Sequence, residues 1–195
     1  MYSIKFDMAT AYDVRALPAP PTLNEINKFV ALRLHSLQVD PSLFGSTYER
    51  EIAFTEDQWR QRLDGHNKVT FIVNPHSDDE SWIATMSIVA PSETIYDYLA
   101  PVRNTDVGKD SDIYAMFGIW VRPEHRRRGL GRRLIEEGLE WIRKDNVKNG
   151  KVPKVLVLQL NEKNVAGWAL YGRMGFEVLP LKEESVHPWM FCYVA

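Results

Sequence analysis

A turn with two closely spaced glycines lies between a strand-like segment and a helix-like segment in the middle of the chain. Residues 114–121 are mostly apolar, and residues 130–144 carry leucine and isoleucine at helical spacing. Because Gly129 and Gly131 lie at the start of this helix, several backbone N–H groups there lack an intrahelical acceptor and point toward one place, at the positive end of the helix dipole. Neither glycine has a side chain, so a phosphate group can come close to the backbone. The segment therefore predicts a pyrophosphate-binding turn.

Basic residues gather at this turn although the chain as a whole is slightly acidic. Six of the 24 lysines and arginines lie within positions 122–133, while the formal net charge is −2. The turn therefore carries a local positive charge that attracts anions. The overall charge argues against a nucleic-acid partner. It lacks the third glycine of a dinucleotide-binding motif and the Gly-Lys-Ser or Gly-Lys-Thr of a P-loop. A solvated basic loop stays open as the alternative interpretation.

The remaining segments predict a mixed α/β fold. Thr22 has Glu25 three residues later, as in a capping box, and opens a helix with an apolar stripe. The stripe consists of Leu23, Ile26, Val30, Leu34 and Leu37. Further helical patches cover residues 47–53, 56–63 and 164–174, and strand-like segments cover residues 12–17, 69–73, 82–89, 155–160, 176–179 and 189–194. We expect one domain over residues 1–195.

Cysteine, histidine and hydropathy patterns exclude several other classes of protein. Cys192 is the only cysteine, which excludes an intrachain disulfide and a Cys-rich zinc site. The five histidines show no paired ligand spacing, so no metal site is expected. The longest uncharged apolar run near the middle, residues 113–121, is too short to span a bilayer, and the N-terminal segment has no long apolar stretch. We therefore expect no membrane partner and a cytoplasmic location.

Residues 121–131 resemble the acyl-CoA motif of the GNAT N-acetyltransferases. Their sequence is Val-Arg-Pro-Glu-His-Arg-Arg-Arg-Gly-Leu-Gly, and the family pattern is Arg/Gln-x-x-Gly-x-Gly/Ala after a strand and Val-x-Pro. A second signature of that family follows at the right distance, as Asn164, Leu170-Tyr171 and Met174-Gly175-Phe176. The resemblance covers residues 113–178 and extends more weakly over residues 32–47. One departure is Arg127, where the family often has glycine.

The resemblance implies a fold, a cofactor and a set of binding residues. The implied fold is a mixed, mostly antiparallel central sheet flanked by helices, with strands splayed at the acyl-CoA site. The implied activity is direct transfer of an acetyl group from acetyl-CoA to a primary amine, with Tyr171 protonating the departing thiolate. The strand bulges near Ile119–Val121 in this family, and a backbone N–H there would stabilise the thioester oxygen. The implied cofactor-binding residues are Ile119, Trp120, Val121, Arg126, Arg127, Arg128, Gly129, Leu130, Gly131, Arg132, Asn164 and Tyr171.

The acceptor side is expected to comprise residues 23–63 and the loop 90–112, opposite the acyl-CoA side at residues 113–178. Its candidate substrate-contacting residues are Phe44, Tyr48, Glu51 and Tyr114. Aromatic and acidic residues in these segments suit a cationic amine with an apolar body, and we expect a small molecule. A protein or peptide acceptor is the alternative, as is an acyl-CoA-binding sensor without transfer activity. Either a monomer or a homodimer is compatible with the sequence.

Overall fold

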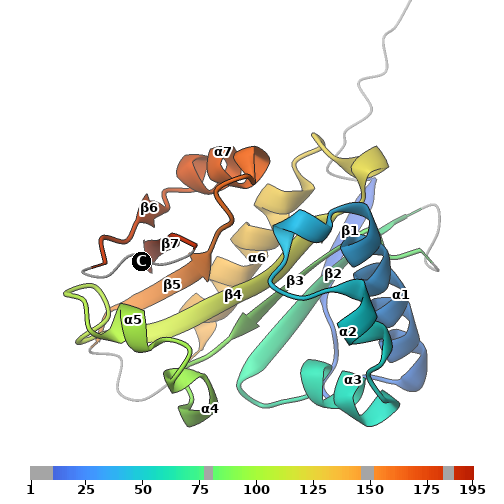
Figure 1. Cartoon of the computed structure of the whole chain (residues 1–195), viewed down its shortest axis with the longest axis horizontal. Coiled ribbons are helices and arrows are strands. Elements are labelled where there is room, and N and C mark those ends of the chain that lie inside the picture. The colour runs from blue at the N-terminus through green and yellow to red at the C-terminus, as the bar shows by residue number, and fades with distance from the viewer. Residues whose placement is uncertain (1–10, 77–80, 146–151, 182–186) are drawn as a thin grey trace, which may run out of the picture.

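The computed structural model describes residues 11–76, 81–145, 152–181 and 187–195, and these residues form one central sheet with helices on both faces (Figure 1). The described strands form a seven-stranded sheet in the order β1-β2-β3-β4-β5-β7-β6. Their bounds are β1 Tyr12–Ala16, β2 Lys68–Pro75, β3 Ala84–Val89, β4 Asp112–Val121, β5 Lys154–Gln159, β6 Glu177–Val178 and β7 Trp189–Val194. Only β4 and β5 pair in parallel within this described sheet, and the other neighbours are antiparallel. The predicted mixed, mostly antiparallel sheet is confirmed.

The helices divide between the two faces of the sheet. Their bounds are α1 Leu23–Val39, α2 Tyr48–Ile52, α3 Glu56–Leu63, α4 Glu93–Tyr96, α5 Ala100–Arg103, α6 Leu130–Lys144 and α7 Val165–Arg173, with short 3-10 turns η2 Pro41–Leu43 and η3 Pro123–His125. One face packs its core residues against α6 and α7. The other face is covered by α1 and α3 over one half and by α4 and α5 over the other half (Figure 1).

Helix α1 begins where the sequence predicts, but its buried face differs from the predicted stripe. The capping box is formed, since the Thr22 hydroxyl accepts the Glu25 N–H at 3.3 Å and the Thr22 N–H donates to the Glu25 carboxylate at 2.9 Å. Leu23 is 49% exposed, however, and the buried face includes Arg33 and Ser36. The prediction of the apolar stripe was therefore wrong at Leu23, and it did not include the buried polar side chains of Arg33 and Ser36.

Strands β4 and β5 part halfway along their length. They pair from Asp112 with Lys154 to Ala115 with Val157, and β4 then continues alone on that side to Val121. On its other side, β4 shifts register against β3 between Phe117 and Trp120, and Gly118 has a φ of 60° there. This irregularity is a β-bulge, which bends one strand away from its neighbour. It opens a gap in the sheet just before the glycine-containing turn.

No helix within the described ranges combines the length and apolar character that a membrane crossing requires. The same ranges contain no group of three or more His, Cys, Asp or Glu side chains placed to hold a metal ion.

Candidate active site

The turn between β4 and α6 contains two residues with a left-handed backbone conformation. Arg127 has a φ of 60° and Gly129, the N-cap residue of α6, has a φ of 78°. Arg127 is the only non-glycine residue with positive φ in the described part of the chain. Its backbone therefore has the left-handed conformation that glycine adopts most easily. Glycine is often found at this position in the family that the sequence resembles.

Six consecutive backbone N–H groups of this turn are free to bind a ligand. The N–H of Arg126 donates to the carbonyl of Pro123 at 3.2 Å. The next N–H along the chain that donates to a carbonyl is that of Arg133, which bonds to Gly129 at 3.0 Å. Within the described ranges, the six N–H groups of residues 127–132 donate to no protein acceptor. They lie at the positive end of the α6 dipole, so the turn fits an anionic diphosphate without help from side chains.

Three of the arginine side chains at this turn are already held by other protein groups. Arg126 donates to the Val121 carbonyl at 2.9 Å and also pairs with Asp40. Arg128 donates to the Tyr12 hydroxyl at 2.7 Å, and Arg132 pairs with Glu136 one helical turn later at 2.7 Å. These guanidinium groups therefore already have protein partners, whereas the backbone N–H groups of residues 127–132 have none within the described ranges.

A backbone N–H group at the end of β4 faces the gap that β5 leaves. The N–H of Arg122 donates to the carbonyl of Ile83 at 2.8 Å, toward β3. Successive residues of a regular strand direct their N–H groups to opposite sides, so that of Val121 points away from β3 and into the gap, whereas Ile119 lies within the bulge, where this alternation is broken. Trp120, between them, turns its side chain to the α1 face, where its indole N–H donates to Asp40 at 2.7 Å. Only the backbone of this segment is therefore available at the gap.

Helix α7 packs beside the start of α6 and carries two of the predicted residues. The Asn164 side chain accepts the Gly167 N–H at 2.8 Å and so caps α7. A Cβ added to Gly131 would lie 3.0 Å from the Leu170 side chain, so the two helices approach closely. Tyr171 is 4% exposed and packs on Phe176, and this burial raises the pKa of its hydroxyl well above the ordinary value.

A cavity of about 620 Å³ lies on the α1 face beside the bulge of β4 and the end of β5. Its apolar wall consists of Phe29, Leu43, Phe44, Val89, Tyr98, Met116 and Phe117. Gly118 and Gln159, at the two sides of the strand gap, also line it. The cavity therefore meets the gap between β4 and β5, where an acyl group and an acceptor could come together.

The sequence and the fold of this chain match one known family. Residues 33–176, most of the chain, match the family model for the GNAT family of acetyltransferases. The chain belongs to this family. Members of the family use acetyl-CoA. A comparison with curated proteins gives no match.

Several solved GNAT structures share the fold at low sequence identity. A GNAT acetyltransferase from Streptococcus pneumoniae is 18% identical, with a TM-score of 0.65 over 94% of this chain and 99% of that one. The PaiA N-acetyltransferase of Thermoplasma acidophilum, solved in complex with coenzyme A, is 10% identical, with a TM-score of 0.58 over 93% of this chain and 98% of that one. The ribosomal-protein-S18-alanine N-acetyltransferase of Escherichia coli is 15% identical, with a TM-score of 0.54 over 94% of each chain. These likenesses show the fold and leave the acceptor class open.

The four candidate substrate residues do not come together in the GNAT fold. Phe44 lines the cavity, but Tyr48, at the start of α2, does not. Tyr114 is fully buried and its hydroxyl donates to Asp145 at 3.0 Å, at the end of α6 on the opposite face of the sheet. Glu51 is also fully buried, beneath the cavity, and is paired with two arginines. Neither Tyr114 nor Glu51 is therefore placed to touch an acceptor.

The basic side chains of the cavity were missed by sequence reasoning. Arg33 from α1, Arg62 from α3 and Lys68 from β2 all line it. Arg33 lies on the predicted helix between two apolar residues, and its position on the buried face of an amphipathic helix was the one signal available. Arg62 and Lys68 give no such signal, because their convergence depends on how α3 packs against α1.

Proposed function

We propose that this GNAT protein transfers an acetyl group from acetyl-CoA directly to a primary amine. The observation that carries the proposal is the run of six free N–H groups at residues 127–132, at the start of α6 and beside the gap in the sheet. Acetyl-CoA supplies a thioester whose acetyl carbon accepts a nucleophile. In this proposal the six N–H groups bind its diphosphate, and the gap between β4 and β5 admits its pantetheine arm.

The chain's own groups then act on the charges that develop. The N–H group of Val121 stabilises negative charge on the thioester oxygen, since it is fixed in place before the reaction. A bond forms between the amine nitrogen and the acetyl carbon, and the carbon–sulfur bond breaks. The amine proton passes to water, the sulfur receives a proton from Tyr171, and Tyr171 regains its proton from water after coenzyme A leaves. Burial raises the pKa of Tyr171, so its hydroxyl starts in the protonated state that this role needs.

The size of the cavity favours a small-molecule acceptor. About 620 Å³ is within the range of small-molecule sites, which commonly enclose about 300–1,000 Å³. Its aromatic wall suits an acceptor with an apolar body, as Phe44 and Phe117 both line it. A peptide acceptor would occupy this cavity with its terminal residue alone.

Thiol release from acetyl-CoA over a panel of amines tests the proposed reaction. We expect release of coenzyme A that depends on the amine, with the acetylated amine detected by mass spectrometry. Tight binding of coenzyme A without release over small amines and peptides would instead indicate a sensor without transfer activity. Release only with peptides would overturn the small-molecule assignment and keep the reaction.

Substitution of Gly129 by leucine is expected to weaken coenzyme A binding about tenfold or more. A side chain at this position would stand at the start of α6, and the left-handed φ of 78° strains any residue with a Cβ, so the six N–H groups would no longer converge. Isothermal titration calorimetry with coenzyme A measures the change.

The control is Gly175→Leu, because Gly175 is also exposed, has a φ of 82° and has open space around its Cα. This control shares the backbone strain but lies after α7, away from the turn. Equal affinities of the two variants for coenzyme A would contradict the assignment of the phosphate site to residues 127–132.

A further inference from the structure

The acceptor cavity is lined by three cationic side chains and by no carboxylate from the described residues. Arg33, Arg62 and Lys68 reach it from α1, α3 and β2. The acidic residues expected on this side do not line the cavity either, since Asp97 and Glu49 lie elsewhere in the described segments. The charge of the cavity is thus opposite to the charge that would attract the cationic amine expected from the sequence.

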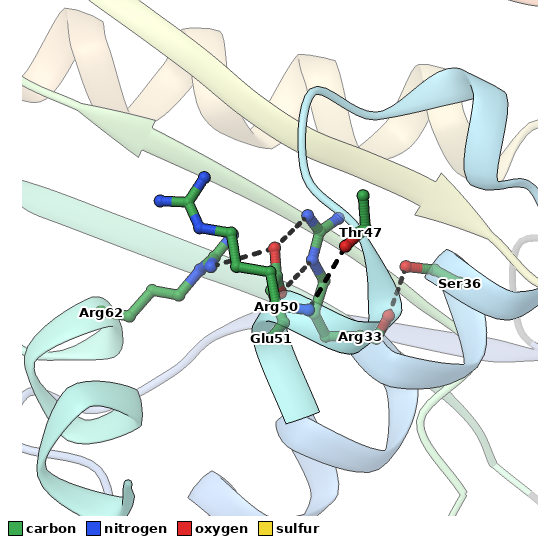
Figure 2. Close-up of polar contacts among 6 residues, drawn as sticks. All are labelled: Arg33, Ser36, Thr47, Arg50, Glu51 and Arg62. Atoms are coloured by element: carbon green, nitrogen blue, oxygen red, sulfur yellow. Dashed lines mark hydrogen bonds and ion pairs between the residues drawn. The ribbon is translucent and has the colours of Figure 1, made fainter. Parts of the chain in front are cut away.

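One buried carboxylate compensates only part of this positive charge. Glu51 accepts two hydrogen bonds from Arg33, at 2.7 and 2.8 Å, and its Oε1 lies 3.2 Å from Nη1 of Arg62 (Figure 2). Figure 2 shows the Glu51 carboxylate between the two guanidinium groups, which come from α1 and α3. Glu51 is 0% exposed, so it faces the arginines and not the cavity. A single negative charge therefore pairs with two positively charged guanidinium groups.

Lys68 adds a third positive charge that no cavity carboxylate balances. Its ammonium donates to the carbonyls of Gln61 at 2.7 Å and Arg62 at 3.0 Å, which are neutral acceptors at the end of α3. The carboxylate of Asp64, at the end of α3, raises the pKa of Lys68, whereas Arg50 from α2 lowers the pKa of Arg62. Burial lowers the pKa of both Arg62 and Lys68, which indicates that their charges are incompletely compensated in the protein.

Arg62 is the cation best placed to bind a ligand. Its side chain is 39% exposed, whereas that of Arg33 is 7% exposed and holds both of its Glu51 hydrogen bonds. Arg62 is pre-oriented by the Trp59 ring, 5.6 Å from its guanidinium carbon, and by one contact with Glu51, which leaves other N–H groups of its fork free of that pair. A planar carboxylate is the anion that such a fork binds with two parallel hydrogen bonds.

We propose that the acceptor is a primary amine that also carries a carboxylate, which Arg62 binds at the end of the cavity formed by α1, α3 and the start of β2. The inference rests on the proposed acetyl transfer and replaces the cationic amine expected from the sequence. The apolar wall contacts the body of the acceptor, and the amine reaches the strand gap at Gly118. The surrounding positive charge also favours the neutral, nucleophilic form of the amine.

Matched acceptors that differ only in the carboxylate test this inference. The probes are 6-aminohexanoic acid and 4-(aminomethyl)benzoic acid, in which an apolar body separates the amine from the carboxylate, together with their methyl esters, hexylamine and benzylamine, with rates corrected for the fraction of neutral amine. We expect kcat/KM for the two acids to exceed that for their esters and for hexylamine and benzylamine at least about tenfold, since a charge-assisted hydrogen bond is lost in each. Equal or faster acetylation of the uncharged partners would overturn the inference while leaving the acetyl transfer itself intact. Failure of every amine would overturn both.

Variants of two neighbouring arginines on α3 link the preference to Arg62. Arg62→Gln is expected to reduce the acid-over-ester preference about tenfold, and Arg62→Lys is expected to retain part of it. The matched control is Arg60→Gln, because Arg60 is 38% exposed on the same helix, pairs with Glu56 at 2.8 Å and does not line the cavity. Thermal melting confirms that each variant is folded. An unchanged preference in folded Arg62→Gln, or an equal loss in Arg60→Gln, would exclude Arg62 as the carboxylate-binding residue.

Discussion

Replacement of Tyr171 by phenylalanine is expected to lower kcat for acetyl transfer about 100-fold while the Kd for acetyl-CoA changes less than about threefold. The substitution keeps the ring that packs on Phe176 and removes only the hydroxyl. A buried general acid contributes when the thiolate departs, and it contributes little to binding of the intact thioester. Stopped-flow or steady-state thiol release gives kcat, and calorimetry with coenzyme A gives the affinity.

The control for this loss is Tyr193→Phe on β7, because Tyr193 is 59% exposed and lies outside the site. Burial raises the pKa of Tyr171, so its hydroxyl stays protonated through neutral and moderately basic pH. The wild-type rate should therefore show no decline from phenol ionisation up to about pH 10. An unchanged kcat in Tyr171→Phe would remove this hydroxyl from the mechanism.

The parts of the site that the sequence predicts are those encoded by a short stretch of backbone. Gly129 and Gly131 mark the start of α6 by their spacing after an apolar strand, and the N–H groups of residues 127–132 follow from that local geometry. Thr22 with Glu25 likewise predicts the first turn of α1. Such features depend on neighbours within one turn of helix, so a single sequence is enough to find them.

The acceptor cavity could not be predicted in this way, because it depends on contacts between distant segments. Arg33 and Glu51 are 18 positions apart, and nothing local indicates that an arginine within an apolar helix face pairs with a glutamate of α2. Tyr114 was a candidate because it lies on the strand before the turn, but its side chain points to the α6 face and its hydroxyl donates to Asp145. Which face a residue of a buried strand occupies is settled by packing, since both faces of this strand are apolar.

Glu51→Gln is expected to destabilise the fold by about 3–5 kcal/mol, because it leaves the buried charge of Arg33 without its partner. Glu51 is 0% exposed and joins α1, α2 and α3 through its contacts with Arg33 and Arg62 (Figure 2). Glutamine has a similar shape, so the lost charge rather than a cavity dominates the effect. For a chain of this size the change corresponds to a fall in Tm of roughly 10 °C. Differential scanning calorimetry measures it.

An exposed ion pair on α3 provides the control and pH provides a second test. Glu56→Gln, which removes the exposed partner of Arg60, should lower the free energy of unfolding by less than about 1 kcal/mol.

Burial opposes ionisation of Glu51, but the hydrogen bonds and charge of Arg33, with the charge of Arg62, hold its pKa below the ordinary value. A lowered folded-state pKa means that the stabilisation is present above the unfolded-state pKa of about 4.5 and is lost as pH falls further. The difference in free energy of unfolding between wild type and Glu51→Gln should therefore be constant near neutral pH and decrease below about pH 4.5.

The two arginines that share Glu51 are expected to respond differently to substitution, and this separates the structural from the recognition role of the cluster. Arg33, at 7% exposure, holds the helices together through Glu51, whereas Arg62, at 39% exposure, keeps donors for the cavity. Loss of Arg33 should therefore change Tm strongly, while loss of Arg62 should change acceptor preference more than Tm. A Glu51→Gln protein that melts within about 2 °C of wild type would show that the buried pair does not hold α1, α2 and α3 together.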